Sequence, residues 1–166
     1  MFEEMLAAQP VDYSVMYVDM NSFFASVEQQ ENPEWRGKPL VVVPYLHSNA
    51  SIVAASNEAK ANYGIRVGMK LPQATARCPG LIAVSDHPSV YRDYHQRIMA
   101  ILDGFYCKIG VRSIDEAYMI IPSYARTKNA VYALSQAIKA AFDRELGEYT
   151  KCSIGVGPNI WLAKMA

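Results

Sequence analysis

The sequence lacks the features that would assign it to several large classes of protein. It contains only three cysteines, Cys78, Cys107 and Cys152, and no C-x-x-C spacing, so we expect neither a disulfide framework nor a zinc site. No apolar run approaches the length of a membrane span, and the acidic stretch at residues 1–10 has no apolar core of the signal-peptide type. These absences predict a protein of the reducing cytoplasm with no membrane partner.

The chain also lacks a surplus of basic residues. Its 16 lysines and arginines balance its 16 aspartates and glutamates, so the formal net charge is zero. Proteins that bind nucleic acid on their own usually carry an excess of positive charge, because contacts with phosphates dominate their affinity. We therefore expect weak DNA binding from these 166 residues alone. A catalytic part whose main DNA contacts lie elsewhere is compatible with this charge.

Two acidic clusters stand at the ends of apolar strand patterns. Asp19 follows the apolar run at residues 15–18, whereas Asp115 and Glu116 form a turn between the apolar segments 109–114 and 117–121. Carboxylates at neighbouring strand ends repel one another, and protonation or bound cations must relieve that repulsion. Ligands that offer only oxygen suit Mg²⁺ or Mn²⁺. The pattern therefore predicts a metal-dependent phosphoryl-transfer site.

The order of the predicted elements indicates an α+β fold. Strands are expected at 15–19, 109–111, 117–121 and 153–156, and helices at 21–30, 88–105 and 128–146. With residues 24–85 set aside, this order is that of a ferredoxin-like (βαββαβ) domain. In that topology the first and third strands are antiparallel neighbours at the centre of the sheet. Asp19 is therefore expected beside Asp115 and Glu116.

The segment set aside, residues 24–85, predicts a small α/β insertion after the first strand. Its expected elements are strands at 40–43, 52–55 and 81–84 and helices at 57–63 and 71–77. Asn21 is interpreted as the N-cap of the helix at 21–30, and Asn57 as an N-cap or a functional residue. Pro158 is expected to start the last helix.

Four motifs, in order along the chain, resemble one protein family. The stretches YVDMNSFFASVE, NEAKANYGIRVGM, SIDEAY and IGVGPNIWLAK resemble the Y-family translesion DNA polymerases, the DinB/UmuC/ImpB group that includes DNA polymerase IV. The resemblance implies a polymerase palm at residues 1–23 and 86–166 and a fingers insertion at residues 24–85. It also implies that thumb and little-finger domains follow Ala166 in the whole protein, and that this part alone is inactive.

The resemblance implies an activity and its partners. A member of this group is a template-directed, metal-dependent nucleotidyltransferase of the error-prone lesion-bypass type. It adds a dNMP to a primer 3′-hydroxyl and releases pyrophosphate. The implied partners are primer–template DNA, a dNTP and a sliding clamp contacted through the C-terminal region. The implied setting is DNA repair in the SOS response, in the cytoplasm and near the nucleoid.

The resemblance also implies roles for particular residues. Asp19, Asp115 and Glu116, with the Met20 backbone carbonyl, would bind two Mg²⁺ ions, for which Mn²⁺ can substitute. Taken singly, Asp19 also fits a helix-entry residue, and the other two acids fit a solvated turn. Phe24 would be the steric gate that excludes a 2′-hydroxyl, and its alternative is a core aromatic.

The remaining implied residues would contact the nucleotide or the template. The substrate-binding group consists of Phe23 beside the gate, Asn57, Lys60 and Lys164, and the roof above the nascent base pair consists of Ser51 and Val53. Many family members carry tyrosine and arginine at the positions of Asn57 and Lys60, and a lysine cannot form the bidentate contact of an arginine. Lys164 also fits a solvated helix lysine, and any strand would accept Ser51 and Val53.

Two other functions compete with the polymerase interpretation. A nucleotidyl cyclase shares the palm topology and the two-metal chemistry, but the large insertion after the first strand and the NSFF sequence disfavour it. A non-catalytic family member acting as an adaptor in a mutagenesis complex would have lost the acidic residues. All three acids are present, so we expect an enzyme.

Overall fold

The computed structural model describes residues 12–105 and 107–166, so residues 1–11 of the predicted palm lie outside the described residues. The strands are β1 (Val15–Met20), β2 (Leu40–Val43), β3 (Ala54–Ala55), β4 (Ile82–Ser85), β5 (Lys108–Val111), β6 (Glu116–Ile120) and β7 (Cys152–Gly157). The helices are α2 (Phe23–Glu31), α3 (Asn57–Tyr63), α4 (Leu71–Arg77), α5 (Pro88–Asp103), α6 (Lys128–Glu145) and α7 (Ile160–Met165), with single 3₁₀ turns at Pro33–Trp35 and Ser123–Ala125.

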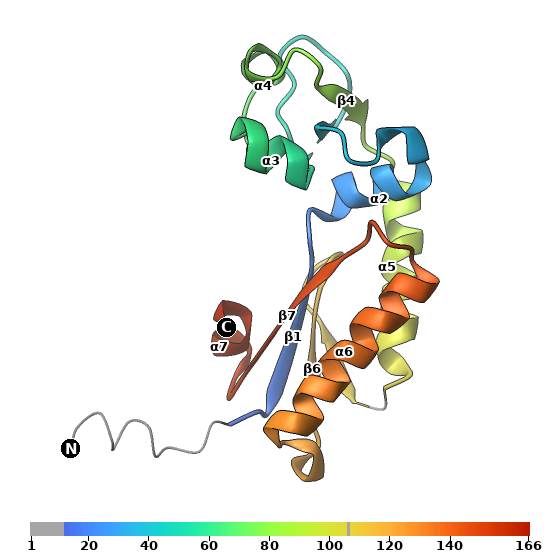
Figure 1. Cartoon of the computed structure of the whole chain (residues 1–166), viewed down its shortest axis with the longest axis vertical. Helices are drawn as coiled ribbons and strands as arrows, with labels where there is room; N and C mark the ends of the chain where they lie inside the picture. Colours follow the sequence, from blue (N-terminus) through green and yellow to red (C-terminus); the bar gives the residue numbers. More distant parts are fainter. Residues whose placement is uncertain (1–11, 106) are drawn as a thin grey trace, which may run out of the picture.

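The larger sheet has the strand order β5-β6-β1-β7, and β1 pairs antiparallel with both β6 and β7. The α+β, ferredoxin-like prediction is confirmed by this order, because the first strand lies at the centre beside the third strand of the βαββαβ pattern. Figure 1 shows α5 and α6 side by side on one face of this sheet and α7 alone on the other.

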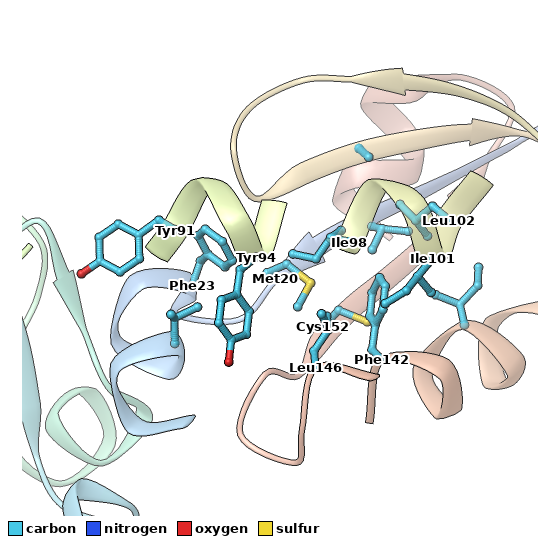
Figure 2. Close-up of a cluster of buried hydrophobic side chains, with 14 of the residues drawn as sticks. Met20, Phe23, Tyr91, Tyr94, Ile98, Ile101, Leu102, Phe142, Leu146 and Cys152 are labelled. Carbon is cyan, nitrogen blue, oxygen red and sulfur yellow. The ribbon is translucent and has the colours of Figure 1, made fainter. Parts of the chain in front are cut away.

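The main core lies between this sheet and the helices α5 and α6. Met16, Val18 and Met20 alternate along β1 and are at most 3% exposed, which directs one face of the strand into the core. They pack in one cluster with Ile98 of α5 and Phe142 of α6. Figure 2 shows Met20, Ile98 and Phe142 of this cluster. Each such side chain contributes roughly 1.5–3 kcal/mol by leaving water, so the sheet and both helices form one stable unit.

The smaller sheet has the order β3-β2-β4, with β2 parallel to β4 and antiparallel to β3. Its own core includes Val41, Val43, Ile52 and Ile65, all at most 1% exposed. In Figure 1 this lobe, with α3 and α4, lies beyond the end of β1 where α2 begins. The end of β1 therefore faces the junction of the two lobes.

Two predicted helix starts are wrong, and so is the interpretation of Asn57 as an N-cap, although its helix begins at the predicted residue. Ser22, rather than Asn21, precedes α2, and it adopts a left-handed conformation (φ 53°) without a side-chain cap. Ser56, rather than Asn57, caps α3 by accepting a hydrogen bond from the Ala59 backbone. The last helix begins at Ile160 rather than at Pro158, because the Asn159 side chain accepts from the Leu162 amide.

The strand predicted at 52–55 is shortened to Ala54–Ala55 in the structure. The Ile52 amide donates to the Met69 carbonyl, and the Gly68 amide donates to the Ile52 carbonyl, so Ile52 pairs with a turn instead of extending β3. Among the described helices, none combines the length and the apolar character that a membrane span requires.

Candidate active site

The acidic residues meet where β1 ends beside the start of β6. In the register of these strands Asp19 lies directly opposite Glu116, and the Met20 amide donates to the Asp115 carbonyl at 3.0 Å. The prediction that Glu116 lies in a turn is wrong, because pairing with Asp19 makes it the first residue of β6. The antiparallel register thus brings the two acidic clusters together.

All three acidic residues line one cleft of about 280 Å³, which we call the carboxylate cleft. Its lining consists of Asp19, Met20, Ser22, Phe23, Phe24, Val53, Ala54, Ala55, Lys60, Val67, Asp115 and Glu116. The cleft therefore takes its acids from β1, from β6 and from the residue directly before β6, its aromatics from α2 and its one lysine from α3.

A second group of polar residues reaches Glu116 from the α7 face of the sheet. Tyr17 and Asp19 share this face because successive residues of a strand point to opposite sides. The Tyr17 hydroxyl donates to Glu116 Oε2 at 3.1 Å, and the Lys164 ammonium forms an ion pair with Glu116 Oε1. The same ammonium lies 5.3 Å from the centre of the Tyr17 ring. Lys164 thus lies beside the acids, outside the lining of the carboxylate cleft.

The two opposed carboxylates of Asp19 and Glu116 differ in their affinity for protons. Burial and the neighbouring Glu116 carboxylate raise the pKa of Asp19 to about 6. A hydrogen bond from Lys164 lowers the pKa of Glu116. These directions agree physically, because Glu116 has an ammonium and a phenol to stabilise its charge. Burial and the repulsion between neighbouring carboxylates therefore destabilise the charged form of Asp19 more than that of Glu116.

The donor set fits a hard divalent cation, although its side chains do not converge on one point in this structure. Among the residues described, no three His, Cys, Asp or Glu side chains are arranged to hold a metal ion together. Glu116 faces Lys164 and Tyr17, while Asp115 accepts a hydrogen bond from the Ser113 hydroxyl at 2.6 Å. The three acids nevertheless share the carboxylate cleft, and oxygen donors of this kind suit Mg²⁺ or Mn²⁺.

The two neighbouring phenylalanines of α2 occupy different environments. Phe23 is 4% exposed and belongs to the main core, although its edge also lines the carboxylate cleft. Phe24 is only partly buried, lines the same cleft, and stacks on Tyr91 of α5 with ring centres 4.4 Å apart. Phe24 is thus the aromatic ring better placed to meet a ligand.

The predicted fingers residues divide between the cleft and its surroundings. Lys60 lines the carboxylate cleft and donates to the Ser22 hydroxyl at 2.7 Å, and that hydroxyl donates to Asn57 Oδ1 at 2.9 Å. Val53 lines the cleft, whereas Ser51 lies outside it and accepts a hydrogen bond from Lys70. The structure therefore brings Val53 and Lys60 to the site and leaves Ser51 and Asn57 beside it.

Sequence reasoning missed Tyr17, Ser22 and Tyr91. Tyr17 could have been found, because it is two residues before Asp19 on the same strand and so shares its face. Ser22 gives no comparable signal, since a left-handed conformation is unusual for serine. Tyr91 lies within the helix predicted at 88–105, and its contact with Phe24 depends on how α5 packs against α2.

Comparisons with known proteins identify the family of this chain. Residues 18–166 match the impB/mucB/samB family. The chain belongs to the impB/mucB/samB family. Its relatives include proteins named DNA polymerase IV from Sulfurisphaera tokodaii (35% identity, 91% of this chain and 43% of that protein) and Pelotomaculum thermopropionicum (37% identity, 92% of this chain and 37% of that protein). The chain spans about two fifths of the length of these curated relatives.

Solved structures of Y-family polymerases share the same fold. DinB from Sulfolobus solfataricus matches with a TM-score of 0.81 at 34% identity, over 91% of this chain and 44% of that one. An insertion ternary complex of Dbh DNA polymerase matches with a TM-score of 0.82 at 33% identity, over the same shares of both chains. The two lobes of this chain are therefore arranged as in Y-family polymerases.

The close packing of α7 in this family member predicts the effect of one glycine substitution. A Cβ atom at Gly155 of β7 would lie 2.0 Å from the Ala163 carbonyl oxygen, so the Gly155→Ala side chain must push α7 away. We expect a loss of about 2 kcal/mol in the free energy of unfolding, measured in urea. Gly80→Ala, where nothing lies within 4 Å, should change stability by less than about 0.5 kcal/mol. Equal stability of both variants would contradict this packing.

The raised pKa of Asp19 predicts a pH-dependent effect on stability without divalent cations. Because the pKa of Asp19 is about 6 in the folded chain and 3.8 for a freely solvated aspartate, the folded form loses stability as pH rises through this interval. Asp19→Asn should remove this loss and stabilise the protein at pH 7.5 by about 1 kcal/mol, a value reduced for solvent screening. Thermal unfolding in EDTA at pH 4 and pH 7.5 measures it. If Asp19→Asn stabilises the protein equally at both pH values, the charge of Asp19 does not destabilise the folded form.

Proposed function

We propose that this chain carries the catalytic centre of a template-directed, metal-dependent DNA polymerase of the error-prone lesion-bypass type. Such an enzyme adds a dNMP to a primer 3′-hydroxyl and releases pyrophosphate. The observation that carries the proposal is that Asp19, Asp115 and Glu116 line one cleft, which Phe24 and Lys60 also line. The names of the relatives, DNA polymerase IV, and of the ternary complex with the same fold support this reaction class.

In this proposal the three acids and the Met20 carbonyl hold two Mg²⁺ ions, and Mn²⁺ can substitute. When bound, the ions lower the pKa of the primer hydroxyl and balance the charge on pyrophosphate. The chain's own cations act on the triphosphate. Lys60 lines the cleft, and the Lys164 ammonium, paired here with Glu116, lies close enough to the acids to meet a phosphate.

The remaining predicted residues define the shape of the nucleotide site. Phe24 would contact the sugar and exclude a 2′-hydroxyl, because its partly exposed ring faces the carboxylate cleft. Val53, with Ser51 beside it, would form the roof above the nascent base pair. Asn57 would act through Ser22. The Ser22 hydroxyl donates a hydrogen bond to Asn57 and accepts one from Lys60.

We further propose a palm at residues 1–23 and 86–166 and fingers at residues 24–85. The separate sheets support this division, and so does the cluster of Val41, Val43, Ile52 and Ile65, which belongs to the smaller lobe alone. The opposite face of the smaller sheet, with Leu40 and Val42, packs into the main core and joins the two lobes. The proposed partners are primer–template DNA, a dNTP and, through the C-terminal region of the whole protein, a sliding clamp. The balanced charge of these residues implies that most of the DNA affinity comes from other domains. The proposed location is the cytoplasm, near the nucleoid.

Product analysis tests this function. The full-length protein is incubated with a labelled primer annealed to a template, one dNTP and Mg²⁺, and both the primer and the nucleotide products are separated. We expect primer extension that requires the template and releases pyrophosphate. A cyclic nucleotide formed without DNA would identify a cyclase. Absence of any nucleotide product, with the protein folded and bound to DNA, would identify a non-catalytic adaptor.

A further inference from the structure

The helix that carries Phe24 is attached to α5 by a row of polar and aromatic contacts. Phe24, Glu28 and Glu31 are spaced four and three residues apart on α2, so they share one side of that helix. Phe24 stacks on Tyr91, Glu28 accepts a hydrogen bond from the Tyr91 hydroxyl at 2.6 Å, and Glu31 accepts one from the Tyr94 hydroxyl at 2.7 Å. Tyr91 therefore contacts Phe24 with its ring and Glu28 with its hydroxyl.

Glu28 is unusual among the acidic residues that the structure describes, because it is buried. It is 3% exposed, and a carboxylate in such a position is destabilising unless hydrogen bonds satisfy it. Besides the Tyr91 hydroxyl, the His87 ring contacts Glu28 Oε1 through Nδ1 at 2.8 Å. His87 directly precedes α5, so Glu28 binds two residues of the first turns of that helix. The carboxylate thus fixes both the start of α5 and the Tyr91 side chain.

Tyr91 has little freedom to move when this contact is intact. It is 2% exposed, and its ring lies at 20° to the Phe24 ring, so the two rings are nearly parallel. Figure 2 shows Tyr91 beside Phe23 in the main core, with Tyr94 farther along the same helix. A phenol held at its hydroxyl end by a buried acceptor cannot tilt without breaking that hydrogen bond. Phe24 therefore stacks on the Tyr91 ring, whose orientation is set by the hydrogen bond from its hydroxyl to Glu28.

We propose that Glu28 is a positioning residue for sugar selection: it holds Tyr91 in place, and Tyr91 holds the Phe24 ring against the carboxylate cleft. This inference rests on the proposed polymerase function and on Phe24 as the gate. Glu28 contacts no substrate in this account and acts only through Tyr91. Loss of its carboxylate widens the range of orientations of the Phe24 ring, so a 2′-hydroxyl is excluded less well.

The chain offers a matched control in the neighbouring pair. Glu31 and Tyr94 form the same kind of carboxylate–phenol hydrogen bond between the same two helices, but neither is stacked on Phe24. The variants are Glu28→Ala and Tyr91→Phe on one side and Glu31→Ala and Tyr94→Phe on the other. Tyr91→Phe keeps the ring and removes only the hydroxyl, so it tests the proposal even if Glu28→Ala does not fold.

Two measurements on the full-length protein test whether Glu28 positions Phe24 through Tyr91. The first is the ratio of kcat/KM for a dNTP to that for the matching rNTP, which we expect to fall about fivefold in Glu28→Ala and about threefold in Tyr91→Phe. The second is the ¹⁹F resonance of 4-fluorophenylalanine placed at position 24, which should shift or broaden in both variants. Glu31→Ala and Tyr94→Phe should leave the ratio within about twofold and the resonance unchanged.

The outcomes separate this inference from the function on which it rests. An unchanged ratio and an unchanged resonance in Tyr91→Phe overturn the role of Glu28, as does an equal effect of the Glu31 and Tyr94 variants. If the wild-type protein incorporates no nucleotide, the proposed function fails. The fluorine resonance then decides alone whether Glu28 positions Phe24, because it requires no catalysis.

Discussion

Asp19→Ala or Asp115→Ala should lower nucleotide incorporation by the full-length protein at least a thousandfold, a rise of about 4 kcal/mol in the activation barrier. Both acids line the carboxylate cleft, and in the proposed reaction they hold the cations that activate the primer hydroxyl. The palm should remain folded, because removing one carboxylate relieves repulsion within the cluster. Single-turnover primer extension measures the rate, and circular dichroism checks the fold.

An acid far from the cleft serves as the control for this substitution. Asp103 is exposed at the end of α5 opposite to the end that contacts α2, so Asp103→Ala should extend primers at the wild-type rate. Extension by Asp115→Ala at a rate near that of the wild type would rule out the assignment of the two-metal site to these acids.

Phe24→Ala should raise the use of ribonucleotides relative to deoxyribonucleotides at least tenfold, about 1.4 kcal/mol of lost discrimination. The reason is steric, because a ring against the sugar leaves no room for a 2′-hydroxyl and an alanine opens that space. The ring is suitably placed, since it lines the cleft that holds the acids. Competition between a dNTP and the matching rNTP in primer extension measures the change.

Phe23 is the natural comparison for Phe24. It is 4% exposed in the main core, so Phe23→Ala should destabilise the protein by about 3 kcal/mol while the choice of sugar stays the same. If Phe24→Ala loses only stability and keeps its sugar selectivity, Phe24 is a core residue. If Phe23→Ala changes the selectivity, the gate has been assigned to the wrong ring.

The part of the site formed by strand pairing could be predicted from the sequence. Apolar runs that stop at Asp19 and restart after Glu116 mark two strand ends, and the ferredoxin-like order makes those strands neighbours. A shift of the register by one residue would turn Met16, Val18 and Met20 to the opposite face, so their burial excludes every odd shift. The sequence therefore places Asp19 close to Glu116, and the structure shows the two residues directly opposite each other.

The details that could not be predicted are not determined by local sequence preference. Serine and asparagine are equally good N-caps, so local preference could not choose between Ser56 and Asn57. The ion pair of Lys164 with Glu116 requires α7 to lie close on β7, which the absence of side chains at Gly155 and Gly157 permits. Neither the distance between these elements nor the direction of the lysine is encoded in the local pattern.

Binding of Mn²⁺ tests the central claim most directly, since Mn²⁺ is paramagnetic and suits the same oxygen ligands as Mg²⁺. The full-length protein with primer–template DNA and a dNTP is titrated with Mn²⁺, and the bound ion is followed by electron paramagnetic resonance. We predict two bound Mn²⁺ ions per complex. In the Asp19→Asn, Asp115→Asn double variant, this binding should be lost although the protein remains folded. Unchanged Mn²⁺ binding in that variant would contradict the assignment of the metal site to the paired ends of β1 and β6.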